Sequence, residues 1–64
     1  MKRIYIHGED PNNYHVNVMR LVNGKEIAET YGALLPKIYL SKYQNDKNFE
    51  VVDVRKEIAL EVKL

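Results

Sequence analysis

The sequence has no cysteine and no tryptophan, and it has three glycines and two prolines among its 64 residues. Without cysteine, no disulfide can close the fold, and no thiolate is available as a metal ligand or nucleophile. The glycines Gly8, Gly24 and Gly32 stand apart in the chain, so they form no glycine-rich phosphate-binding loop. A chain of this length is marginally stable alone, and association with another chain is a common source of added stability.

Long apolar runs and an excess of one charge are also missing. No stretch approaches the roughly 20 apolar residues of a membrane span, and the apolar run in residues 1–7 is too short for a signal peptide. We therefore expect a cytoplasmic protein with no membrane partner. Ten basic and nine acidic residues give a net charge of +1, whereas a nonspecific nucleic-acid binder usually carries a larger positive excess.

What the chain does have is alternation of apolar and polar residues, which predicts three strands. Residues 2–7 place Ile4 and Ile6 on one face, and the cluster of turn-forming residues 8–13 separates them from a second strand over 14–22. Residues 49–63 alternate so regularly that they predict one long strand. At about 3.3 Å per residue it would span roughly 50 Å, so we expect it to bend at Lys56 or to pair with another chain.

Residues 25–43 are harder to assign. Ile27, Tyr31, Leu34 and Ile38 recur at helical spacing, which favours a helix that is kinked or broken at Gly32 and Pro36. The alternative is a hairpin at Asn23-Gly24, a strong turn signal between strands, and an all-β chain. We predict a single α+β domain over residues 1–64, with a small antiparallel or mixed three-stranded sheet (about 2–7, 14–22 and 49–63) and this helical segment (about 25–43).

No pattern of catalytic or metal-binding residues appears. His7, Glu9, Asp10 and His15 surround one turn and are suitable metal ligands, but their spacing matches no known metal motif. The single serine, Ser41, has no recognisable base partner. We therefore expect a protein that is not an enzyme and that has no cofactor and no metal. Carboxylate pairs for acid–base chemistry could be drawn from Glu26, Glu29, Glu57 and Glu61, which resemble ordinary solvated charges.

Tyrosine is abundant, with five copies, and it is enriched at protein interfaces because it offers a large apolar area with a polar tip. The alternative is that these tyrosines complete a small core while their hydroxyls reach water. The residues predicted to bind a partner are Tyr5, Lys37, Tyr39, Lys42, Tyr43 and Arg55. The residues predicted to form a dimer interface, on the apolar face of the last strand, are Ile58, Leu60, Val62 and Leu64.

Residues 24–32 resemble the short helical segment of the AbrB/MazE-type swapped-hairpin DNA-binding domains. The resemblance covers about nine residues and implies an obligate dimer that binds DNA through basic hairpin residues, here Arg3 and Arg20. The sequence departs from the family pattern at Gly24, where proline is usual, at Tyr31, where leucine is usual, and in the residues that follow. We therefore do not assign the chain to this family.

Together these observations predict a small, homodimeric, non-enzymatic interaction protein that binds and modulates or inhibits another protein. Its frequent Lys, Asn, Ile and Tyr have A/T-rich codons, which is typical of many bacteriophages and low-GC bacteria, so a phage or mobile element is a reasonable source. The alternative is a small dimeric DNA- or RNA-binding regulator. It would contact phosphates through Arg20, Lys37, Lys42 and Lys47.

Overall fold

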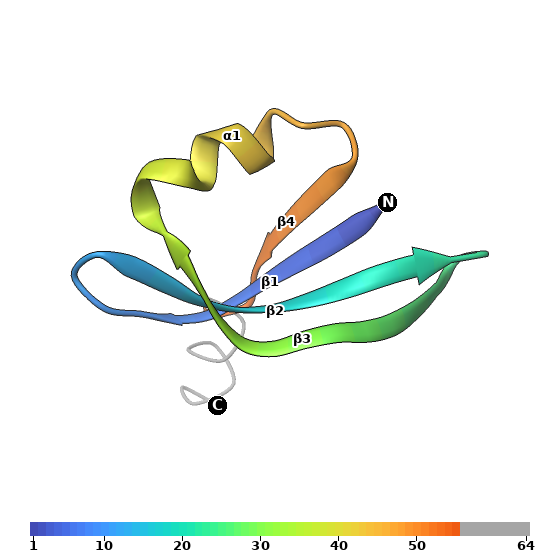
Figure 1. The fold of residues 1–64 in the computed structure, drawn as a ribbon, viewed down its shortest axis with the longest axis horizontal. Coiled ribbons are helices and arrows are strands. Elements are labelled where there is room, and N and C mark those ends of the chain that lie inside the picture. The colour runs from blue at the N-terminus through green and yellow to red at the C-terminus, as the bar shows by residue number, and fades with distance from the viewer. Residues whose placement is uncertain (56–64) are drawn as a thin grey trace, which may run out of the picture.

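The computed structural model describes residues 1–55 of the chain. They form a small α+β fold in which a four-stranded mixed sheet carries one short helix on one face (Figure 1). The α+β class and the mixed sheet agree with the sequence prediction, and the fourth strand is an addition to it. The elements in chain order are β1 (Lys2–Glu9), β2 (Asn13–Val22), β3 (Lys25–Pro36), the 3-10 helix η1 (Lys37–Tyr39), α1 (Leu40–Gln44) and β4 (Phe49–Asp53).

The strands lie in the order β3-β2-β1-β4. Strand β2 is antiparallel to both β1 and β3, whereas β4 runs parallel to β1. A parallel neighbour cannot follow from a tight hairpin, so the chain must cross over the sheet before β4 begins. Figure 1 shows that η1, α1 and the loop after α1 make this crossing above one face. Strands β3 and β4 are consequently the two edges of the sheet.

The core is small and lies between the sheet and this crossing segment. Its buried side chains are Ile4, Ile6, Val16 and Leu35. Ile6 is paired with Val16 across β1 and β2, and its side chain is 2% exposed. Burying one such side chain is worth about 1.5–3 kcal/mol, so these few residues carry much of the hydrophobic stabilisation.

The prediction of a helix over residues 25–36 is wrong, because these residues form strand β3. Asn23 and Gly24 have φ angles of 52° and 79°, and this pair of positive values makes the tight turn that joins β2 to β3. The sheet register shifts twice along β3, at Glu29 and again before Ala33. Each shift adds a residue to β3 and reverses the alternation of its faces. The apolar residues of β3 therefore do not recur at every second position, and their spacing resembles that of a helix.

The second irregularity in β3 is supported by a side chain of β2. Gly32 has a φ of 69°, a conformation that residues with a Cβ rarely adopt. Its backbone N–H donates a hydrogen bond to Oδ1 of Asn17 at 3.0 Å. Helical structure does occur within the predicted segment, but it is confined to η1 and α1, after Pro36. Since that helix exists, the all-β alternative is not favoured either.

The last predicted strand is confirmed for residues 49–53. Beyond β4, the N–H of Val54 donates to the carbonyl of Ile6 at 3.0 Å. The rest of that prediction, together with the expected bend at Lys56, lies outside the described residues. The same holds for the predicted dimer interface of Ile58, Leu60, Val62 and Leu64. The AbrB/MazE resemblance is not supported, because residues 24–32 form a turn and an edge strand where that family has a helix.

We predict that Gly24→Ala lowers the free energy of unfolding by about 1–2 kcal/mol, the cost of placing an L-residue in the left-handed region. No atom outside the neighbouring residues lies within 4 Å of the position that a Cβ would occupy, so this cost is conformational and not steric. D-alanine at the same position in a synthetic chain is the control, because it prefers positive φ. Urea denaturation of both variants is the measurement, and equal destabilisation by the two isomers would contradict the explanation.

Candidate partner-binding surface

Exposed apolar side chains gather along one part of the chain. Seven large hydrophobic residues are exposed among the described residues, and six of them lie between positions 22 and 39. We call Leu34, Ile38 and Tyr39 the outer strip, since they follow one another where β3 passes into η1. They are 60%, 80% and 49% exposed, respectively. Several exposed apolar side chains in one short segment are a feature of protein interaction sites.

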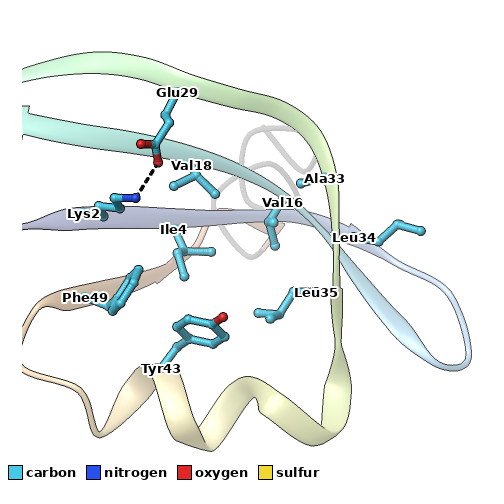
Figure 2. Close-up of a pocket in the computed structure, with 10 residues that line it drawn as sticks. All are labelled: Lys2, Ile4, Val16, Val18, Glu29, Ala33, Leu34, Leu35, Tyr43 and Phe49. Carbon is cyan, nitrogen blue, oxygen red and sulfur yellow. Dashed lines mark ion pairs between the residues drawn. The ribbon is translucent and has the colours of Figure 1, made fainter.

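Leu34 of the outer strip also lines a pocket of about 270 Å³ between the sheet and α1. Figure 2 shows aliphatic side chains from the sheet on one side of the pocket and the rings of Tyr43 and Phe49 on the other. These two rings meet edge to face, with centroids 4.9 Å apart. The residues that line the pocket are Lys2, Ile4, Val16, Val18, Glu29, Ala33, Leu34, Leu35, Tyr43 and Phe49.

The two ends of the pocket differ in chemistry. At one end, Nζ of Lys2 lies 3.0 Å from the carboxylate of Glu29, and Leu34 stands at the opposite end (Figure 2). Between them the walls are almost entirely apolar, because the five residues of α1 cover a longer sheet face incompletely and Ala33 fills little space. A pocket of this size and lining suits a single apolar side chain of a partner, in the way that buried anchors fill interface pockets.

Within residues 1–55, several basic side chains form no ion pair, whereas nearly all acidic side chains do. Arg20, Lys25, Lys42 and Lys47 form no ion pair within residues 1–55. The carboxylates, by contrast, are paired with basic side chains, except Asp46, which accepts a hydrogen bond from the N–H of Asn48. The charge left without a partner within residues 1–55 is therefore positive. Unpaired positive charge favours acidic partners.

Two of the predicted binding residues, Lys37 and Arg55, both lie over the ring of Tyr14. Nζ of Lys37 and the guanidinium carbon of Arg55 lie 5.3 and 5.2 Å from the centre of the Tyr14 ring. Both cations also pair with Glu9, Lys37 at 2.5 Å, and Arg55 is held further by Asp53 through contacts of 2.9 and 2.7 Å. These contacts occupy the Lys37 ammonium, so it is not a free phosphate contact.

The remaining predicted residues do not share one surface. Tyr5 lies on the sheet face opposite α1, where its hydroxyl donates a hydrogen bond to Glu26 and Arg3 joins the same carboxylate at 2.5 Å. The Tyr5 hydroxyl and the Arg3 guanidinium together lower the pKa of Glu26. Tyr43 lines the pocket, Tyr39 belongs to the outer strip, and Lys42 lies on α1 between them. Leu34 and Ile38 were not predicted as surface residues, because their helical spacing placed them on the buried stripe of a helix.

The residues considered as metal ligands near the first turn have contacts with one another and with the backbone of the turn. Asp10 accepts hydrogen bonds from the backbone N–H groups of Asn12 and Asn13 at 2.9 and 2.8 Å, and it lies 3.2 Å from Nε2 of His15. These contacts, the one from Asn12 foremost, lower the pKa of Asp10. The rings of His7 and His15 meet edge on, 6.4 Å apart. Within the described part of the chain, no three His, Asp or Glu side chains gather as a metal site.

Comparison with known proteins gives no relative: no family model, curated protein or solved structure matches the chain. Among residues 1–55, no helix has the length and apolar character required to span a membrane.

We predict that the contribution of Glu9 to stability depends on pH. Its hydrogen bond with Lys37 lowers the pKa of the Glu9 carboxyl below the usual 4.5. A carboxyl with a lowered pKa stabilises the fold fully above its unfolded pKa and loses that contribution as the pH falls through its folded value. Glu9→Gln should therefore lower the urea midpoint at pH 7, and the difference from the natural protein should shrink as the pH falls below 4.5.

Glu50→Gln is the control for the loss of one negative charge, since Glu50 pairs with Arg3 on the other face of the sheet and not with the Lys37–Arg55 cluster. Equal pH profiles for the two variants would contradict a specific role of the Glu9 ion pairs.

Proposed function

We propose that this chain is a small, non-enzymatic interaction protein that binds another protein through the outer strip and the adjoining pocket. The observation that carries the proposal is the position of Leu34, at the same time 60% exposed and part of the pocket wall. An apolar segment of a partner can therefore cover the strip and insert a side chain into the pocket without any rearrangement of the sheet. Binding of this kind would modulate or inhibit the partner by occupying its surface.

The charges of the described residues support a particular kind of partner. Because Arg20, Lys42 and Lys47 are left without ion pairs within residues 1–55, the partner segment is expected to carry acidic residues around one apolar anchor. Lys42 lies on α1, the helix that also supplies Tyr43 to the pocket. Complementary charge raises the rate of encounter and selects partners, while the buried anchor provides most of the binding free energy.

The alternative of a nucleic-acid regulator uses three of the same cations, Arg20, Lys42 and Lys47. Its support from the described contacts is weaker, because Lys37 is occupied by Glu9 and because phosphates would leave the pocket unused. A cytoplasmic location fits both functions and is consistent with a chain that has no cysteine. Origin from a phage or mobile element remains part of the proposal, on the codon argument alone.

We predict that Ile38→Ser weakens partner binding by about 1–2 kcal/mol, as is typical for loss of an apolar interface side chain. Stability should be unchanged, since the Ile38 side chain is 80% exposed. The measurement is an affinity pull-down from lysate of the source cells with and without nuclease, followed by titration of the captured protein. Val22→Ser is the matched control, because Val22 is exposed but is the last residue of β2, at the opposite end of the β2–β3 pair from Leu34.

The pocket is tested separately with Ala33→Leu, which fills it from the wall. We expect weaker binding of the captured protein together with an unchanged or higher melting temperature, because the new side chain occupies space that the partner would use. Capture that is lost on nuclease treatment would favour the nucleic-acid alternative. Capture that survives in both Ile38→Ser and Ala33→Leu would contradict the proposed surface.

A further inference from the structure

The outer edge of β3 is a second surface, distinct from the outer strip. β3 forms an edge of the sheet, and its first eight residues, from Lys25 to Gly32, are all exposed. From Lys25 to Ala28 its pairing with β2 is regular, and the first register shift follows at Glu29. An edge strand of this kind offers unpaired backbone groups to another strand.

The register identifies which backbone groups these are. In a hairpin with a two-residue turn, the residues that flank the turn exchange hydrogen bonds, and every second pair along the ladder does the same. Val22 and Lys25 flank the turn, and Arg20 is paired with Ile27. The N–H and C=O groups of Lys25 and Ile27 thus point toward β2. Those of Glu26 and Ala28 point away from β2 and face no other strand within residues 1–55, so they can pair with a further strand.

We propose that the occupant of this edge is a second copy of the same chain, bound antiparallel about a twofold axis beside Ile27. In this register Glu26 and Ala28 of each copy exchange backbone hydrogen bonds with Ala28 and Glu26 of the other. Ile27 faces its own copy, and Lys25 faces Glu29. The two sheets would then form one continuous sheet, closed by symmetry as in most homodimers.

Charge complementarity selects this register from the three that the free backbone groups allow. A shift in one direction would place Glu26 opposite its own copy, and like charges directly opposite one another are destabilising. A shift in the other direction would place Ala28 opposite its copy and Ile27 opposite Glu29, so that Lys25 would lose its acidic partner. The register centred on Ile27 alone joins opposite charges on both sides of an apolar pair.

The side chains agree with this arrangement. Lys25 and Ile27 alternate with Glu26 and therefore share one face of β3, and Glu29 reaches Lys2 on the α1 side of the sheet. Lys25 has no ion pair within residues 1–55, whereas Ile27 is 45% exposed and would be covered by its copy. The register shift begins at Glu29, the last residue of the proposed pairing, which limits pairing to a short segment and prevents extension along the strand.

The dimer is tested by sedimentation velocity of the full chain from micromolar to millimolar concentration. We expect concentration-dependent dimerisation, slower amide exchange at Glu26 and Ala28 as concentration rises, and intermolecular contacts between Ile27 methyl groups in a mixed-label NMR sample. Ile27→Glu should give a monomer, since it places carboxylates face to face. Ile38→Glu is the matched control for dimerisation, with the same substitution at an exposed isoleucine of η1 away from this edge, and should still dimerise.

A charge exchange tests the register itself. Lys25→Glu should weaken the dimer about tenfold, because two symmetry-related attractions become repulsions. The triple variant Lys2→Glu/Lys25→Glu/Glu29→Lys, which keeps opposite charges at positions 2 and 29, should recover most of the loss. Recovery would support the proposed register. A monomer at millimolar concentration would overturn the proposal, and so would a dimer that is abolished by Leu60→Glu but not by Ile27→Glu.

Discussion

The parallel pairing of β4 with β1 is the constraint on which the rest of the described structure depends. Because β1 lies between β2 and β4, both of its edges are occupied, and Ile4 and Ile6 are buried in the centre of the sheet. A parallel partner also requires the chain to pass from one end of the sheet to the other. That crossing places η1 and α1 over one face, so the same requirement creates the core and the pocket beside it.

The brevity of the crossing explains why the pocket is open. The segment that covers the sheet has one turn of 3-10 helix and five residues of α-helix, which is too little to cover a strand as long as β3. Leu35 reaches the core, whereas its neighbour Leu34 stays at the surface. The opening of the pocket is thus a geometric result of a short cover on a long strand.

Local patterns allowed β1, β2 and the start of β4 to be predicted, because their faces alternate against a core that is consistently on one side. The same reasoning failed for β3. As an edge strand with added residues at Glu29 and before Ala33, it has neither a constant buried face nor a constant period. The correct signal was Asn23-Gly24, whose positive φ values specify a hairpin. Of the predicted binding residues, Tyr43 lines the pocket, whereas the pocket itself depends on contacts between residues distant in sequence.

The two proposed surfaces use different properties of β3, and its irregularities keep them apart. Before Glu29 the strand is regular, so the backbone N–H and C=O groups of Glu26 and Ala28 are spaced to pair with the same groups of a second copy. After Gly32 the strand turns toward the core, where Leu35 is buried and Leu34 marks the rim of the pocket. Pairing at the first segment leaves the second uncovered, and a twofold dimer would present two such pockets to its partner. Two linked sites raise the effective affinity for a partner that is itself multivalent. The irregularities of β3 would then serve binding, because they separate the dimer edge from the pocket.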